Sequence, residues 1–271
     1  MVRDITLGQY MPGKSMIHRL DARAKILLLI AYIVFIFVAK NYMALMLITM
    51  ASLLVVLLTK VKFSMYLKSM KVILFVVVLT GILNLFYGTG NILWEWEFIK
   101  ITDGGINNAI FVTIRIATLV LISSILTFTT SPSDLTDALE RLMKPLAFFH
   151  VKVHEIAMMM TIALRFIPVL LEETDKIMNA QKARGADMES GGVIKRIKAL
   201  IPVLIPLFVS SFRRATDLAM AMECRCYNGG KGRTRMKQLH FTKMDFMGML
   251  FSAAVFAGVV LCNIYFGSVV K

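Results

Sequence analysis

Apolar residues along this chain of 271 residues gather into blocks long enough to cross a membrane. The hydrocarbon core of a bilayer is about 30 Å thick, and a helix needs roughly 20 residues to cross it. The pattern predicts five spanning helices, at residues 26–39, 42–59, 72–87, 106–130 and 244–270. Only Lys40 and Asn41 separate the first two blocks, so we expect these blocks to form a tight helical hairpin.

The segment between the fourth and fifth blocks, residues 131–243, is far too long to be a simple loop. A helix start is predicted at SPSDL, where Ser131 can cap the helix, Pro132 suits its first position and Asp134 follows three residues after the cap. Leucines at helical spacing then form one apolar stripe. The segment therefore begins with an amphipathic helix.

Two longer amphipathic helices are expected after it. One runs from about Val151 to Arg184 and contains Pro168, where a kink is expected, and the next starts near Ile194 and ends in AMECRCYNGG. These helices are too apolar to be left in water and too charged to cross the bilayer. We therefore expect them to pack against partners.

Composition agrees with a membrane protein, because 58% of the residues are hydrophobic and the mean hydropathy is +0.72, against about 45 to 50% apolar residues in soluble domains. The predicted fold class is an all-α integral membrane protein, with about five transmembrane helices and three amphipathic cytoplasmic helices. Its expected parts are a four-span membrane region at 1–130, a cytoplasmic helical region at 131–243 and a final transmembrane helix at 244–271.

The distribution of basic residues predicts the orientation, because loops rich in Lys and Arg stay in the cytoplasm. Five basic residues lie in 1–25, four in 60–71 and 18 in 131–243, which together make 27 of the 31. We expect a multi-pass plasma-membrane protein with a cytoplasmic, retained N-terminus and an external C-terminus. The net charge of +14 follows from this topology and from attraction to anionic lipid, so nucleic-acid binding is not expected.

Several kinds of transport or catalytic chemistry lack the residues they would need. The first four blocks contain no Asp or Glu, and Asp245 lies only at the margin of the fifth, which disfavours a proton- or sodium-coupled carrier. The GGKG run at 229–232 does not fit a phosphate-binding loop. A membrane-embedded enzyme or a channel with an unrecognised site stays the alternative to a non-catalytic subunit.

Arg115 lies about ten residues into the fourth block, where a charge is costly and is a functional candidate by default. Its alternative role is structural, with hydrogen bonds to carbonyl groups or to Asn84 of the third block. His150 and His154 have the spacing of zinc ligands, but a third ligand is not apparent, so we expect neither a metal site nor a cofactor in this chain. The chain has three cysteines, and two of them lie in the inferred cytoplasm. This number and location argue against a disulfide framework.

Two arginines near helix ends each stand between small residues and just before a glycine-containing turn. A cation near a helix C-terminus complements the helix dipole, and this alone could account for either arginine. The recurrence on successive helices also suits contact with another protein, because small neighbours allow close approach and a guanidinium offers five donors. The two triplets are Ala183, Arg184 and Gly185, and Cys224, Arg225 and Cys226.

The chain resembles the transmembrane T component of energy-coupling factor (ECF) transporters, of the type shared among several substrate-binding subunits. The resemblance rests on GQYMPGKSMIHRLDARAK at 8–25, SPSDLTDALERLMKPL at 131–146, ALRFIPVLLEETDKIMNAQKARGAD at 163–187 and PLFVSSFRRATDLAMAMECRCYNGGKGRTR at 206–235. The small-Arg-small triplets are the signature of that family, although the family often has alanine where this chain has Cys224.

The resemblance implies a non-catalytic subunit of an ATP-driven importer for vitamins or other micronutrients. Arg184 and Arg225 would each dock into a groove on one of two ABC-type ATPase subunits, and ATP and Mg would be bound by those partners. The three amphipathic helices would act as coupling helices that carry the ATPase motion to a separate membrane-embedded substrate-binding S component. The chain itself would bind no cofactor.

Overall fold

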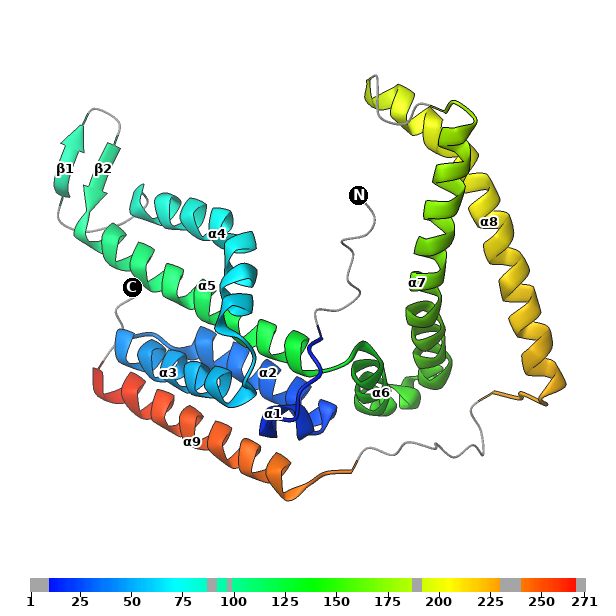
Figure 1. The fold of residues 1–271 in the computed structure, drawn as a ribbon. Coiled ribbons are helices and arrows are strands. Elements are labelled where there is room, and N and C mark those ends of the chain that lie inside the picture. The colour runs from blue at the N-terminus through cyan, green and yellow to red at the C-terminus, as the bar shows by residue number, and fades with distance from the viewer. Residues whose placement is uncertain (1–9, 87–91, 97–98, 187–191, 230–239, 267–271) are drawn as a thin grey trace. The chain divides into compact units, whose positions relative to one another are not determined.

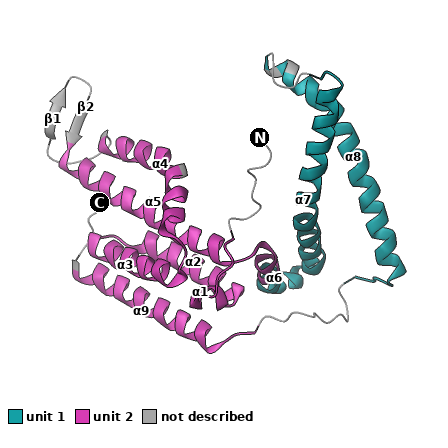
Figure 2. Cartoon of the chain, viewed as in Figure 1, with its two compact units in different colours: residues 1–7, 139–238 teal, residues 8–138, 239–271 magenta. Residues whose placement is uncertain are grey.

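A computed structural model describes residues 10–86, 92–96, 99–186, 192–229 and 240–266 (Figure 1). The chain divides into two compact units, one of residues 8–138 and 239–271 and the other of residues 139–238 together with 1–7 (Figure 2). We call these the bundle unit and the hairpin unit. The expected end of the last span at Val270 lies outside the described residues.

The bundle unit consists of helices packed around an apolar centre. Its elements are α1 (Met16–Arg19), α2 (Ala22–Val38), α3 (Tyr42–Thr59), α4 (Phe63–Phe86), α5 (Asp103–Thr129), the first part of α6 (Pro132–Leu142) and α9 (Lys243–Phe266). Phe35 and Ile36 of α2, Ile48 of α3, Ile122 of α5 and Val259 of α9 form one buried cluster. The last helix therefore packs with the first ones, which its distance in sequence does not suggest.

Short polar side chains begin these helices. The Asp21 carboxylate accepts the N–H of Arg23 at the start of α2, and the Asn41 side chain accepts the N–H of Ala44 at the start of α3. Asn41 also donates to the Cys262 carbonyl of α9 at 2.7 Å. The turn between α2 and α3 is thereby tied to α9, and the expected hairpin of the first two spans is formed at Lys40 and Asn41.

The third predicted span differs from the structure. Residues 60–71 were expected to form a loop, but α4 starts at Phe63 and bends by 57° between its parts Phe63–Lys71 and Ile73–Leu85. The apolar block marks only the second part, because the first part mixes basic and apolar residues. Helical structure there comes from packing, since Tyr66 is buried against Phe128 of α5.

A short antiparallel hairpin of β1 (Ile92–Trp96) and β2 (Ile99–Thr102) lies between α4 and α5, with Trp94 opposite Ile101. This hairpin was not expected from the sequence, although ILWEW alternates apolar and polar residues at its end. Apart from this hairpin, the described part of the chain is helical, so the expectation of an all-α integral membrane protein is confirmed.

The hairpin unit holds the end of α6, a 3₁₀ helix η1 (Lys144–Phe149) and the two long helices α7 (Val153–Ala183) and α8 (Val193–Cys224). Ser131 caps α6 as expected: its hydroxyl accepts the N–H of Asp134 at 3.1 Å and donates to the Asp134 carboxylate at 2.7 Å. Pro168 lies within α7, and Pro202 and Pro206 lie within α8.

Among the residues that the structure describes, five helices are long and apolar enough to cross a membrane, and α4 adds a sixth if its bent halves form one span. Three of the five, α3, α5 and α9, coincide with predicted spans, whereas α2 has only 17 residues. The other two are α7 and residues 196–224 of α8, which were expected in the cytoplasm. Length and composition alone therefore do not separate the amphipathic helices from the spans.

Candidate functional site

The first arginine triplet forms the end of α7. Arg184 is the C-cap, and Gly185 follows with a positive φ of 85°. The N–H of Gly185 donates to the Lys182 carbonyl at 3.0 Å, and the N–H of Ala186 donates to the Gln181 carbonyl at 3.0 Å. This pair of bonds is a Schellman motif, in which the residue after the C-cap adopts the left-handed conformation that glycine favours.

The second triplet ends α8 in the same way. Arg225 is the C-cap and Cys226 follows with a positive φ of 55°. The N–H of Cys226 donates to the Glu223 carbonyl at 2.8 Å, and the N–H of Tyr227 donates to the Met222 carbonyl at 3.0 Å. The two arginines thus occupy equivalent positions of two Schellman motifs, and a left-handed residue follows each of them. At Gly185 the residue type suits this conformation, whereas Cys226 adopts it although it has a Cβ.

Both triplets lie at the surface of the hairpin unit. All six residues are exposed: Ala183, Arg184, Gly185, Cys224, Arg225 and Cys226. Within the described residues, neither guanidinium forms a hydrogen bond or ion pair, and nothing lies within 4 Å of a Cβ added at Gly185. Two cations with five N–H donors each are therefore open to a partner that supplies acceptors.

Contacts between α7 and α8 place the two arginines at opposite ends of one antiparallel hairpin. The Gln181 amide donates to the Pro202 carbonyl at 3.4 Å, and the Glu173 carboxylate accepts from Ser210 and, at 2.8 Å, from the Arg214 guanidinium. Residues later in α7 thus contact residues earlier in α8, so the two helices are antiparallel. Arg184 lies at the end where the chain turns, and Arg225 lies at the other end of α8.

The length of α8 sets the scale of this separation. Gln181 near the end of α7 contacts Pro202 of α8, and Arg225 follows Pro202 by 23 residues, which at about 1.5 Å per residue is about 35 Å along the helix. One compact partner groove cannot hold both guanidinium groups at that spacing. The arrangement fits two separate grooves, one at each end.

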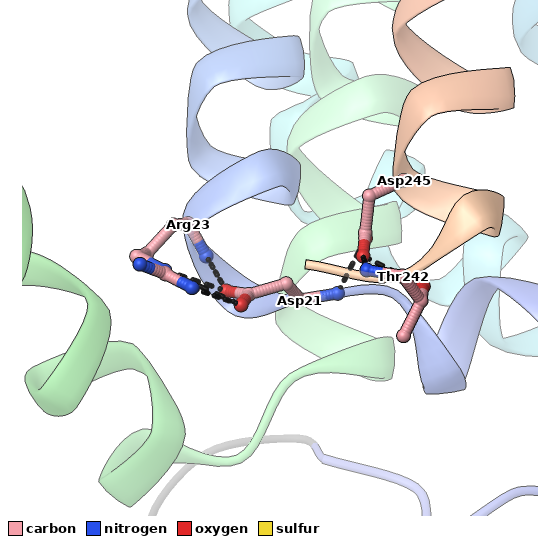
Figure 3. A network of polar contacts seen from close by, with 4 residues as sticks. All are labelled: Asp21, Arg23, Thr242 and Asp245. Atoms are coloured by element: carbon pink, nitrogen blue, oxygen red, sulfur yellow. Dashed lines mark hydrogen bonds and ion pairs between the residues drawn. The ribbon is translucent and has the colours of Figure 1, made fainter. Parts of the chain in front are cut away.

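A polar network in the bundle unit joins the start of α2 to the start of α9 (Figure 3). The Asp245 carboxylate accepts the N–H of Asp21 at 2.7 Å through one oxygen, and the N–H and hydroxyl of Thr242, each at 2.7 Å, through the other. The Asp21 carboxylate binds the Arg23 guanidinium at 2.6 Å, and that guanidinium lies 4.3 Å from the Phe241 ring centre. Asp245 was noted in the sequence only as a marginal acidic residue, and its spacing to Thr242 is the capping-box signal that could have identified it.

His18 belongs to the same end of the bundle unit. Its Nδ1 lies 2.6 Å from the Ser15 hydroxyl and its Nε2 lies 3.0 Å from the Met11 carbonyl, which suits a neutral ring that accepts from Ser15 and donates to Met11. Burial lowers the pKa of His18, and the positive charge of Lys25 lowers it further, against the hydrogen bond to Met11, which raises it. The ring also fills the space beside Gly13, where an added Cβ would lie 2.7 Å from it.

Arg115 and Asn84 are not brought together. The Arg115 guanidinium donates to the Ala39 carbonyl at the end of α2 at 2.9 Å and lies 4.7 Å from the Phe111 ring centre. The Asn84 amide donates to the Thr80 carbonyl one turn earlier in α4, at 2.9 Å. Of the two structural options for Arg115, the structure thus contains the bond to a carbonyl, and this bond ties α5 to α2.

His150 and His154 do not converge on a common ligand. The His154 ring lies 3.1 Å from the Glu140 carboxylate, and His150 ends η1 with a positive φ of 62°. Among the described residues, no three His, Cys, Asp or Glu side chains lie close enough to hold a metal ion. Cys224, Cys226 and Cys262 are free thiols.

Known proteins similar to this chain agree on one family. The profile of the CbiQ family, described as cobalt transport protein, matches residues 13–236. The energy-coupling factor transporter transmembrane protein EcfT of Ruminiclostridium cellulolyticum is 54% identical over 245 residues, which cover 90% of this chain and 92% of the relative. The EcfT of Clostridium kluyveri is 48% identical over 98% of this chain and its own full length, and that of Bacillus subtilis is 45% identical over 90% and 93%.

Proposed function

This chain belongs to the CbiQ family and is an EcfT-type transmembrane component of an energy-coupling factor transporter, and on that premise we propose that it couples two ABC-type ATPase subunits to a separate substrate-binding S component. The complex imports a vitamin or another micronutrient. The partners bind ATP and Mg, and this chain carries out no catalytic step itself.

The observation that carries the proposal is the geometry of Arg184 and Arg225. Each is exposed, each is the C-cap of a Schellman motif, and they lie at opposite ends of one antiparallel helix pair. A guanidinium at each end suits one groove on each of two ATPase subunits. Relative motion of the two ATPases would then act on the two ends of a single hairpin.

Internal contacts of the hairpin support its role in transmitting motion. The Glu173 carboxylate binds both Ser210 and Arg214, and the Gln181 amide binds the Pro202 carbonyl. Hydrogen bonds to charged groups are stronger than neutral ones, by about twofold. A displacement at one end would therefore move α7 and α8 together rather than one helix alone.

The proposed orientation places α7 and α8 in the cytoplasm, with the N-terminus inside and the C-terminus outside. The support is the distribution of basic residues, 27 of 31 on one side of a five-span arrangement. Both helices carry a polar face with exposed cations, such as Arg165 of α7 and Arg213 of α8. These side chains fit an interface with protein or headgroups better than hydrocarbon.

Mild detergent extraction followed by mass spectrometry tests the assembly directly. We expect the full-length chain to co-purify with two ABC-type ATPase subunits, or two copies of one, and with a small apolar membrane protein. Recovery of the chain without ATPases under conditions that keep it folded would contradict the proposal. ATP-independent transport activity of the chain alone would do the same.

A further inference from the structure

A cavity of about 340 Å³ opens in the bundle unit, at the end where α2 and α9 begin and α3 and α5 end. Side chains of α1, α2, α3, α5 and α9 line it, and nearly all of them are apolar. Leu28, Leu58, Ile125, Met247 and Phe251 are among them. Its volume lies within the range of about 300 to 1,000 Å³ that small-molecule sites occupy.

Four polar residues line this mostly apolar cavity, Ser52, Thr129 and, from α2, Lys25 and Tyr32. Lys25 and Tyr32 are each 8% exposed. The Lys25 ammonium donates to the Thr129 carbonyl at 2.8 Å and to the His18 carbonyl at 3.3 Å. An ammonium has three N–H donors, so one is left over, and no ion pair of Lys25 occurs within the described residues.

The Tyr32 hydroxyl is buried and has no hydrogen-bond partner among the described residues. A buried hydroxyl without a partner is costly, and each such group in a native structure calls for an explanation. Lys25 and Tyr32 are seven residues apart, which is close to two helical turns, so both lie on one face of α2 about 10 Å apart along the helix axis. The residues that line the cavity therefore include a cation and a tyrosine with an unpartnered hydroxyl, both on one face of α2.

We propose that this cavity binds one anionic phospholipid, with a phosphate oxygen at Lys25, an oxygen of the glycerol ester region at Tyr32 and part of an acyl chain among the leucines and methionines. The neighbouring carboxylates form no ion pair with Lys25 among the described residues: Asp21 binds Arg23, Asp245 binds Asp21 and Thr242, and Asp134 accepts a hydrogen bond from Ser131. Arg19 is exposed on α1 beside the cavity residues Met16 and Ile17, and adds a further positive charge for a headgroup.

A lipid suits this site better than a helix of a partner protein. The Lys25 ammonium has one N–H donor left over, and the exposed Arg19 adds a second cation. The polar side of the site therefore suits an anionic headgroup, which an apolar helix does not provide. An acyl chain is narrower, and the flexible side chains of Met16, Met244 and Met247 can adapt to it.

Native mass spectrometry of the full-length chain in detergent, with whatever subunits co-purify, tests the proposal. Phosphatidylglycerol and phosphatidylcholine with identical acyl chains are added separately at equal concentration. We expect a one-to-one adduct with phosphatidylglycerol that forms at about fivefold lower lipid concentration, which is the effect of one basic side chain at an anionic headgroup. Equal adduct formation with both lipids, or no adduct, would overturn the proposal.

Gly248 of α9 provides a variant that blocks the cavity without touching its polar groups. A Cβ there would lie 3.6 Å from Leu28 and 3.7 Å from Leu20, so a small side chain fits and a longer one enters the cavity. We expect Gly248→Leu to remove the adduct and the exposed control Ala254→Leu to keep it. Survival of the adduct in Gly248→Leu would also overturn the proposal.

Two conservative variants separate the polar contacts. Tyr32→Phe keeps the ring and removes only the unpartnered hydroxyl, so it should weaken the adduct with either lipid, whereas unchanged binding would exclude the proposed contact. Lys25→Met should abolish the preference for phosphatidylglycerol. If Lys25→Met fails to fold, the comparison of Gly248→Leu with Ala254→Leu still decides the proposal, and ATPase recovery in each variant reports the proposed function separately.

Discussion

The side chain of Asp245 accepts a 2.7 Å hydrogen bond from the backbone N–H of Asp21, and so joins helix starts that are 224 residues apart in sequence. The same carboxylate accepts the N–H and hydroxyl of Thr242. Asp245 is 1% exposed. This buried acceptor fixes α9 against α2 at one end of the bundle.

Replacing Asp245 by asparagine should destabilise the bundle unit. The NH₂ group of the asparagine would face either the N–H of Asp21 or the N–H of Thr242, and that donor would lose its acceptor. We expect a loss of about 1 to 3 kcal/mol, the cost of leaving a buried donor without an acceptor. Thermal unfolding in detergent measures it. The exposed Asp217 of α8 provides the control: Asp217→Asn should change stability by less than about 0.5 kcal/mol, and equal stability of the two variants would contradict the role of Asp245.

Stability should also depend on pH through His18. Because the folded protein holds the pKa of His18 below its ordinary value of 6.5, the folded state binds fewer protons than the unfolded state as the pH falls below 6.5. The thermal midpoint should therefore be highest above pH 6.5, fall between 6.5 and the lower pKa of the folded state, and then level off. His18→Gln should flatten this part of the profile, and an unchanged profile in that variant would refute the assignment.

The residue after each arginine has a left-handed backbone, so substitutions there should act through the backbone conformation. Cys226→Gly should preserve or slightly raise stability and keep ATPase binding, because glycine adopts a positive φ without the cost of about 1 to 2 kcal/mol that other residues meet. Cys226→Val should weaken ATPase binding although Arg225 is unchanged, since a β-branched residue resists this conformation. Co-purification of ATPase subunits measures both effects, and equal recovery with valine and glycine would contradict the prediction.

Much of the helix pattern could be predicted from the sequence, because local signals determine it. The cap at Ser131 and the glycine after Arg184 set the ends of α6 and α7 within a few residues. The start of α4 was missed because packing of Tyr66 stabilises its first part. The β-hairpin could not be predicted, because an alternation of only three residues, WEW at 94–96, is too short to indicate a strand.

The geometry around the two arginines could not be predicted from the sequence, for a different reason. The small residues beside Arg184 and Arg225 were interpreted as room for a partner, but a positive φ at Cys226 cannot be recognised from residue type. The placement of the arginines at opposite ends depends on contacts such as Glu173 with Arg214, which are long-range in sequence. The Ala39 carbonyl that Arg115 binds is likewise fixed only by the packing of α2 against α5.

The membrane orientation can be tested by labelling single cysteines. In a background with Cys224→Ala, Cys226→Gly and Cys262→Ala, a cysteine at Lys40 should react with an impermeant reagent from outside the cell. A cysteine at Gly192 should react only after permeabilisation, and an added Cβ there meets nothing within 4 Å. The reverse pattern would place α7 and α8 outside and contradict their contact with ATPases.

Recovery of ATPase subunits with Arg184 and Arg225 variants tests the central claim most directly. If each guanidinium makes charge-assisted hydrogen bonds in a desolvated groove, truncating either arginine to alanine should weaken ATPase binding by about 2 to 5 kcal/mol. If the arginines only complement the helix dipole, each substitution should cost about 0.3 to 1 kcal/mol of helix stability and leave assembly intact. Lysine at either position keeps the charge and loses the planar fork, so Arg184→Lys should also weaken binding if the groove is shaped for a guanidinium.

The decisive measurement compares the double variant Arg184→Ala/Arg225→Ala with Arg165→Ala/Arg213→Ala, which removes two exposed arginines of the same helices. Both are purified in mild detergent and scored for membrane insertion, S-component recovery, ATPase recovery and uptake. We predict that the first variant inserts and retains the S component but loses ATPase subunits and uptake, while the second keeps all four. Normal ATPase recovery and transport in the first variant would contradict the account and leave the two triplets as ordinary helix ends.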